Sequence, residues 1–512
     1  MAPGRIIAPP RRRLRLPRQS LQPALHYYPS VSASAGFAFG PFQVSLSSRQ
    51  LMRGEEALPL ASRHFDVLVA LVSQAGRVIT KNALVEVGWQ DVAVTENSLE
   101  QAISTLREVL GRSPSGEPYI RTLPRRGYIF IGDVAPLRAT DEGMDAVLEP
   151  HRAWLEGREA LERLGRSEAG VALRAFERAI EAAPHEAPLH VGLANACAWQ
   201  FEATRADEHP AVEMLARALT HAREACRLDL QYGEAWATLG FVLNRAGETA
   251  EGLAAARRAV SLEPGSWRHH LRLAFVSWGE ERLRAADRAS QLMPGLALAH
   301  WLMAVVHVAR QAFDAAWTEA ERGSVAQDAQ DAAAPFGAVG LHWLRGLLLY
   351  QRGDLAGALA AFEHELGFEA SGHMYARECC ANAWYAIGVA HARHGRPEDA
   401  GTAFAEVLAR IPTHAQALAM LATADVQMRA RFDTAVSRLE HRGAVGDAAV
   451  ARATDLVQRG SHEDAATVVQ QMLAAATPGP AAWIVPIEPA LHVAMQPSAW
   501  APALARLRTR AG

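Results

Sequence analysis

Hydrophobic positions between residues 37 and 135 change from strand-like to helical spacing and back again. The stretch from Phe37 to about Leu60 has a β-strand pattern, interrupted by a charged turn at 53–55. Three stretches of helical spacing follow, with apolar faces made by Phe65, Leu68, Val69 and Val72, by Leu84 and Val87, and by Leu99, Ile103, Leu106 and Leu110. The segment "YIRTLPRRGYIF" at 119–130 then predicts a hairpin of two short strands.

Helix-ending and helix-starting residues agree with these stretches. Gly76 and Gly111 follow the first and third, as glycine commonly does at a helix C-terminus. Asn97 and Glu100 have the spacing of a capping box for the third helix, and Thr95 is an alternative cap. The order of strands, three helices and a hairpin predicts an α+β winged helix over residues 36–135.

Beyond a linker expected at 136–150, the chain becomes helical, rich in Ala, Leu and Arg, and repetitive. Aligning 235–264 with 383–412 matches Trp236 with Trp384, Gly240 with Gly388, Gly247 with Gly395, Gly252 with Ala400, Ala256 with Phe404, and Pro264 with Pro412. This resembles the 34-residue tetratricopeptide pattern, in which small residues let two helices approach and large ones fill the gap. We therefore expect an all-α superhelix of six to nine helical hairpins over 151–475, with a less regular helical segment at 476–512.

Length and charge narrow the class of protein. A chain of 512 residues is too long for one core, and its net charge of −3 does not mark it as a general polyanion binder. Residues 1–35 contain six arginines and no acidic residue, which predicts a basic, disordered extension, whereas 36–135 contain ten basic and ten acidic residues. Lys81 is the only lysine, so phosphate contacts elsewhere must come mainly from arginine. No apolar run approaches the ~18 residues of a membrane span, so we expect no membrane helix.

Motifs for catalysis or metal binding are missing from the sequence. Cys197, Cys226, Cys379 and Cys380 form no CxxC pair, which favours buried, reduced thiols, although the adjacent last two leave a redox role open. His391 and His394 lie three residues apart on an expected helix, but no third ligand accompanies them. We therefore expect no metal, no cofactor and no enzymatic activity.

The stretches "HFDVLVALVSQAGRVITKNALVEVGW", "ENSLEQAISTLREVLG" and "YIRTLPRRGYIF" resemble the OmpR/PhoB-type winged-helix DNA-binding domain. Two residues depart from that pattern: His64 replaces the usual Glu, and Ala61 replaces the usual Thr or Ser, which weakens the cap of the first helix. The roughly 35 preceding residues are too few for a receiver domain, so we expect a regulator without one.

The resemblance implies a DNA-reading role for the third helix and the hairpin. The outward face of that helix carries Gln101, Ser104, Thr105 and Glu108, with Ser98 and Arg107 at its edges, and such side chains read base edges in a major groove. A solvated helix face is the alternative. Arg125 or Arg126 at the hairpin tip, the "wing", would enter a minor groove, while Arg121 and Thr122 would hold phosphates.

Three further assignments complete the expected DNA interface. Thr80 and Lys81 begin the second helix, where free N–H groups and a cation suit a phosphate. Tyr128, in the Arg-Gly-Tyr turn of the wing, is counted with the DNA-binding residues. By resemblance, the loop at 88–95 contacts RNA polymerase.

We interpret the chain as a bacterial-type, cytoplasmic transcription regulator that binds double-stranded DNA. It is similar to ToxR-like regulators lacking the membrane helix, and less so to Streptomyces antibiotic regulatory proteins. The repeats would bind a protein or peptide, or self-associate. One alternative stays open because residues 36–135 have no net charge: a repeat scaffold whose winged helix binds protein. A sensor whose repeats enclose a small ligand is a second alternative.

Overall fold

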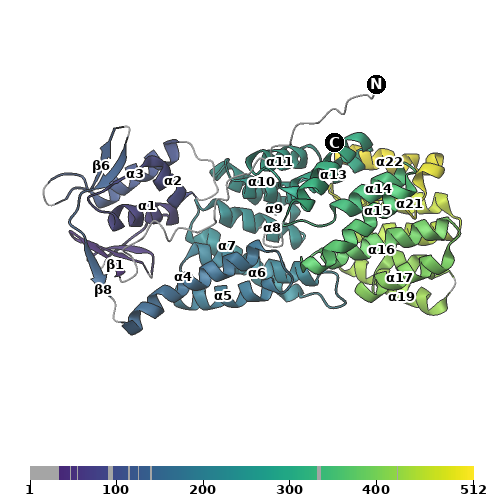
Figure 1. Ribbon diagram of the computed structural model, residues 1–512, viewed down its shortest axis with the longest axis horizontal. Helices are drawn as coiled ribbons and strands as arrows, with labels where there is room; N and C mark the ends of the chain where they lie inside the picture. Colours follow the sequence, from purple (N-terminus) through teal and green to yellow (C-terminus); the bar gives the residue numbers. More distant parts are fainter. Residues whose placement is uncertain are drawn as a thin grey trace, which may run out of the picture.

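The structure is a computed structural model that describes residues 34–46, 48–54, 56–89, 96–113, 116–124, 126–138, 141–330, 336–423 and 425–512. A small α+β domain lies at one end of the molecule, and a long array of paired helices extends from it (Figure 1). The two expected fold classes, a winged helix followed by a tetratricopeptide-type superhelix, are therefore both confirmed.

The N-terminal sheet is antiparallel, with strand order β4-β3-β2-β1-β8. Its strands are β1 (Ser34–Phe39), β2 (Phe42–Ser45), β3 (Gln50–Arg53), β4 (Glu56–Leu58) and β8 (Ala135–Arg138). The charged turn expected at 53–55 connects β3 to β4, where Arg53 pairs with Glu56. Strand β8 was not foreseen, because only pairing with β1 gives residues 135–138 an extended partner. Most of the remaining expected linker is the start of a helix.

Three helices and a second sheet complete this domain. They are α1 (Ser62–Ser73), α2 (Lys81–Gly88) and α3 (Glu96–Leu110), with strands β5 (Val78–Ile79), β6 (Ile120–Leu123) and β7 (Gly127–Phe130) in the order β5-β7-β6. Apolar residues chosen from the helical spacing lie in one buried core: Phe65, Leu68, Val69, Val72, Leu84, Leu99, Ile103, Leu106 and Leu110. Ala61 precedes α1 without a side-chain cap, as its departure from the family pattern implied.

The capping box proposed for α3 is wrong. The helix begins at Glu96, so Asn97 lies inside it, and Thr95 lies outside the described residues. Glu100 instead pairs with Lys81 of α2, with 3.0 Å between Oε1 and Nζ. A cation on the neighbouring helix is a stronger partner for this carboxylate than a neutral backbone N–H.

In the described part of the chain, α4 to α21 form nine consecutive helix pairs, within the expected six to nine. The pairs are α4 (Asp141–Glu162) with α5 (Glu168–Ala182), α6 (Ala187–Thr204) with α7 (Val212–Leu228), α8 (Gly233–Arg245) with α9 (Thr249–Leu262), α10 (Trp267–Val276) with α11 (Gly279–Leu292), α12 (Ala297–Ala309) with α13 (Phe313–Asp328), α14 (Leu341–Gln351) with α15 (Leu355–Leu366), α16 (Ala376–Arg393) with α17 (Pro397–Arg410), α18 (Ala415–Leu421) with α19 (Val426–His441), and α20 (Val445–Gln458) with α21 (His462–Ala475). A short 3-10 helix, η2 (Gly367–Ser371), follows α15.

Close packing within these pairs follows the repeat pattern. A Cβ atom on Gly388 would lie 2.6 Å from the ring of Phe404, and one on Gly346 would lie 2.4 Å from the ring of Phe362. Glycine on the first helix thus makes room for an aromatic ring on the second helix of the same pair. Small and large residues recur at the same positions because the two helices of each pair pack against each other in the same way.

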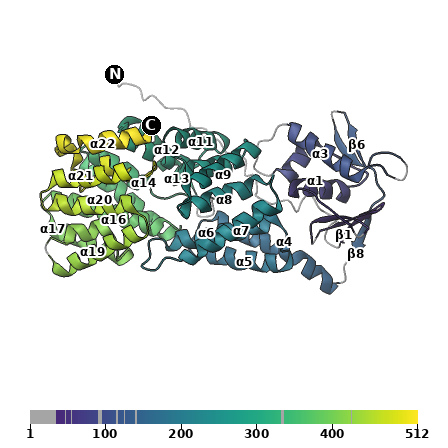
Figure 2. The ribbon, with the colours of Figure 1, turned by 180° about the vertical axis from the view of Figure 1, so that it is seen from behind.

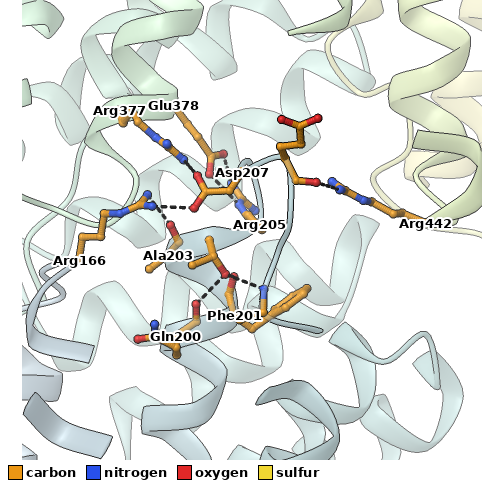
Figure 3. Close-up of polar contacts among 12 residues, drawn as sticks. Arg166, Gln200, Phe201, Ala203, Arg205, Asp207, Arg377, Glu378 and Arg442 are labelled. Atoms are coloured by element: carbon orange, nitrogen blue, oxygen red, sulfur yellow. Dashed lines mark hydrogen bonds and ion pairs between the residues drawn. The ribbon is translucent and has the colours of Figure 1, made fainter. Parts of the chain in front are cut away.

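Polar contacts join the connection between α6 and α7 to later helices of the repeat array (Figure 3). Arg205, which follows α6, forms a bidentate pair with Glu378 of α16, at 3.1 and 2.7 Å. Asp207 binds Arg166 and Arg377, and Glu208 pairs with Arg438 of α19 at 2.8 Å. The connection between α6 and α7 therefore contacts helices roughly 170 to 230 residues further along the chain.

The C-terminal segment folds back onto the first helices of several repeat pairs. It contains η3 (Val485–Ile487), η4 (Val493–Met495) and α22 (Pro497–Ala511). Trp483 packs edge-on against Trp301 of α12 and Trp343 of α14, with ring centroids 6.1 and 6.4 Å apart. The Tyr385 hydroxyl of α16 donates to Glu488 at 2.8 Å. Residues 483–495 therefore cover the face that the first helices present from α12 to α16.

Candidate nucleic-acid interface

Helix α3 turns one polar face outward. Gln101, Ser104 and Glu108 are exposed, whereas Ser98 and Thr105 are half-buried. The opposite face packs into the core of the domain through its leucines and Ile103. The outward side chains offer the amide and hydroxyl groups that pair with base edges in a major groove.

The guanidinium of Arg107, which the sequence predicts to contact DNA, makes two hydrogen bonds within the domain. Nε donates to the carbonyl oxygen of Ile120 at 2.9 Å, and Nη2 donates to Oγ1 of Thr122 at 2.7 Å. Both partners lie on β6, the first strand of the wing. Arg107 therefore joins α3 to the wing, and Thr122 remains exposed with its hydroxyl proton available to a phosphate.

The wing is the hairpin of β6 and β7, in which Thr122 pairs with Tyr128 and Leu123 with Gly127. Arg121 and Arg126 are exposed, and Arg125 lies outside the described residues. Gly127 has φ +133°, and a Cβ atom there would lie 2.0 Å from the carbonyl oxygen of Ile79. Only glycine fits this approach of the wing to β5.

The side chain of Tyr128 is 3% exposed and belongs to the domain core, so its contact with DNA stays a prediction. Its strand pairs with Ile79 of β5 and is covered by the neighbouring elements. Aromatic packing holds the base of the wing as well. The Phe130 ring lies 4.9 Å from that of Phe39 and stacks on Tyr119 at 5.7 Å. This cluster fixes the wing to the N-terminal sheet.

Thr80 and Lys81, at the start of α2, are the residues predicted to bind a phosphate, and each makes a contact within the domain. The Thr80 hydroxyl accepts from the backbone N–H of Ala83 at 3.2 Å, so it caps the helix. Lys81 pairs with Glu100, and both side chains are partly exposed. An exposed pair of this kind contributes only about 0–1 kcal/mol, so a DNA phosphate can compete for the lysine.

One exposed cation near the wing was missed from the sequence. Arg77 lies on the connection between α1 and β5, and β5 pairs with β7 of the wing. Only this strand pairing brings Arg77 to the hairpin, and a two-residue strand gives almost no sequence signal. Of the loop predicted to contact RNA polymerase, only Gly88 and Trp89 lie within the described residues, and Trp89 is buried.

The N-terminal domain contacts the repeats through a different surface. Arg49, before β3, pairs with Asp66 of α1 at 2.8 Å and with Glu186 of the repeats at 3.2 Å. Arg63 of α1 pairs with Glu263 after α9. Within the described residues, the hydrogen bonds and ion pairs of α3 and the wing all remain inside the N-terminal domain. Figures 1 and 2 accordingly show β6 at the end of the molecule furthest from the repeats.

The four thiols form no disulfide, which agrees with the expectation of reduced cysteines. Cys197, Cys226 and Cys380 are buried, and Cys379 is half-buried. Burial raises the pKa of Cys197 to about 11 and those of Cys226 and Cys380 to about 12. These three are protonated at neutral pH and therefore poor nucleophiles.

Residues 54–130 match the sequence profile of the family described as "Transcriptional regulatory protein, C terminal". This match confirms the OmpR/PhoB-type winged-helix domain. The chain is 36% identical to the "Cholera toxin homolog transcriptional activator" of Vibrio parahaemolyticus over 118 residues, which is 22% of this chain and 40% of that protein. It is 32% identical to "Transcriptional regulator HilA" of Salmonella typhi over 105 residues, 20% of this chain and 19% of that protein.

Among solved structures, the DNA-binding domain of E. coli CadC is 30% identical and covers 20% of this chain and 98% of that domain, with a TM-score of 0.19. The matches to the two curated relatives thus span less than half of either relative's length. Among the described helices, each is too short or too polar to cross a membrane.

Proposed function

We propose that this chain is a sequence-specific DNA-binding transcriptional regulator. The observation that carries the proposal is one outward surface that combines the polar face of α3 with the arginines of the wing. Gln101 and Ser104 supply groups for base edges, and Arg126 supplies a cation for a minor groove. Arg107 holds the two elements in a fixed relation. The names of the two relatives, both transcription regulators, support the same function.

Charge sets the character of the proposed binding. Among the described residues, Arg77, Arg121 and Arg126 are exposed cations near the wing. The ten basic and ten acidic residues of this domain balance. Few phosphates are therefore neutralised. The logarithm of the binding constant falls with the logarithm of salt concentration with a slope of about −0.9 per neutralised phosphate, so we expect a modest salt dependence. Self-association or tandem sites would raise affinity through effective concentration.

Regulation through the repeats is the second part of the proposal. Helical-repeat surfaces bind extended segments and partner helices, so a protein or peptide is the ligand we infer. Because residues 483–495 cover the first-helix face from α12 to α16, a partner binding there competes with this segment. RNA polymerase contact through 88–95, and action in the cytoplasm of a bacterium, belong to the same proposal, which includes no enzymatic step.

Selection of full-length protein against a random DNA pool tests the proposal. We expect one enriched sequence, with affinity for it lowered by about 1–3 kcal/mol in Arg126→Ala if that arginine enters a groove. Arg284→Ala is the matched control, because Arg284 is an exposed arginine on α11, in the repeats. A pool without enrichment would contradict sequence-specific reading and favour the scaffold alternative. Equal affinity of both variants would remove Arg126 from the interface.

A further inference from the structure

Two histidines and an aspartate converge on the surface where α13, α14 and α15 meet. Asp328 ends α13, His342 lies in the first turn of α14, and His364 lies in the last turn of α15. Nε2 of His342 is 2.8 Å and Nε2 of His364 is 3.0 Å from the same oxygen, Oδ1 of Asp328. One potential ligand atom from each residue lies within 4.8 Å of the other two. Three donors thus face one small volume.

A buried network holds the backbone beside these three residues. Glu365, the neighbour of His364, is fully buried and accepts from the backbone N–H groups of Gly340 and His342 at 2.7 and 3.1 Å. Gln327, the neighbour of Asp328, accepts from the N–H of Leu341 at 3.0 Å and donates to Glu365 at 3.3 Å. The network therefore fixes the three helix ends before any ligand arrives, which is the preorganisation that a metal site requires.

The side chains of Asp328, His342 and His364 are of the types that bind transition metal ions. Zinc is held in proteins by imidazole nitrogen and carboxylate oxygen, and both kinds of ligand atom are present here.

We propose that Asp328, His342 and His364 form a binding site for a divalent transition metal ion of the zinc type. Zinc lies ~2.0–2.2 Å from imidazole nitrogen and carboxylate oxygen, so tetrahedral ligand atoms are about 3.3 Å apart. The observed separations of 2.8 and 3.0 Å need to open by only a few tenths of an ångström. In the proposed complex each imidazole binds the metal through Nε2 and keeps its proton on Nδ1, and water completes the coordination.

The proposed ion would link the end of α13 to the start of α14 and the end of α15. The end of α13 and the start of α14 flank the connection at 329–340, so a bound ion would hold both ends of this connection in place. A metal ion that binds the folded chain but not the unfolded chain raises the free energy of unfolding. Above Kd, this increase grows with the logarithm of the metal concentration. The site is independent of DNA binding, and it joins residues 14 and 22 positions apart, a spacing that matches no sequence motif.

Isothermal titration of the full-length, chelator-treated protein with Zn²⁺ tests this site. We expect one site in the natural chain and at least about 10-fold weaker binding in Asp328→Asn and in His364→Gln, because removing a ligand costs no less than removing an outer partner. The two side chains are 46% and 54% exposed, so both variants should fold, which circular dichroism checks. The matched control is the double variant His391→Gln/His394→Gln, which should bind as the natural chain does.

Cobalt separates this site from one made by cysteine. Co²⁺ held by two histidines and an aspartate gives visible absorption without the thiolate charge-transfer band that Cys379 or Cys380 would add. Zn²⁺ should raise the melting temperature of the natural chain and of the control, but not of Asp328→Asn. Equal Zn²⁺ affinity in all four proteins, no measurable binding to the natural chain, or a thiolate band would overturn the proposal and leave a hydrogen-bonded His–Asp–His cluster.

Discussion

Replacing Glu488 by glutamine should strengthen the attachment of the C-terminal segment at pH 8 and change it little near pH 4.5. The carboxyl is 5% exposed and accepts from the Tyr385 hydroxyl at 2.8 Å and from the N–H of Ala490 at 3.3 Å. Burial raises its pKa to about 7, although these hydrogen bonds act in the opposite direction. The folded state therefore retains a proton that the unfolded chain releases near the ordinary pKa of 4.5.

The sign and size of the effect follow from this difference. As pH rises from 4.5 to 7, the unfolded carboxyl ionises while the folded one stays neutral, so the folded state loses stability across this window. Above pH 7 both forms are ionised and the loss is complete. At about 1.4 kcal/mol per pH unit, the loss reaches up to about 3 kcal/mol by pH 8 and is below about 1 kcal/mol at pH 5. Glutamine keeps the acceptor oxygen and has no such loss.

Hydrogen exchange of peptides covering 480–496 measures the attachment directly. At pH 8, Glu488→Gln should be protected up to about 100-fold more than the natural chain, and the gain should shrink to a few-fold at pH 5. Glu363→Gln is the control, because Glu363 is an exposed carboxylate on α15. Equal protection of the two proteins at pH 8, or a gain of the same size at both pH values, would refute the reasoning.

Three further substitutions test other contacts. Arg107→Met should lower affinity for the selected DNA site by about 1–3 kcal/mol, because the wing loses its hydrogen bond to α3 at Thr122. Fluorescence anisotropy measures this affinity, and an unchanged value would mean that the wing holds its position without the arginine. Gly127→Ala should destabilise the N-terminal domain by more than about 1 kcal/mol, because of its positive φ and the approach to β5, and an unaltered thermal transition would contradict this. Phe362→Ala should cost the repeats about 3–5 kcal/mol in urea unfolding by emptying the space beside Gly346, and a change below 1 kcal/mol would argue against that packing.

Local patterns in the sequence determined the elements of this protein. The helical spacing of apolar residues predicted α1, α2 and α3 with their buried faces. This works because a helix that buries one face has an apolar residue at every third or fourth position. The repeated glycine and aromatic positions predicted paired helices, and the structure shows that Gly388 of one helix lies against Phe404 of its partner. The outward face of α3, including Gln101 and Ser104, follows from the same periodicity.

Only the tertiary structure decided which side chains are partners. Arg107 binds the wing, Glu100 pairs with Lys81 and Tyr128 is buried, because neighbouring elements bring the necessary groups within reach. The C-terminal segment likewise covers α12 and α14 from more than 130 residues away. The spacing of apolar residues indicates which face of a helix or strand is buried. It does not indicate which distant residue packs against that face. For that reason the sequence located α3 and the wing, and the fold alone brought Asp328, His342 and His364 together.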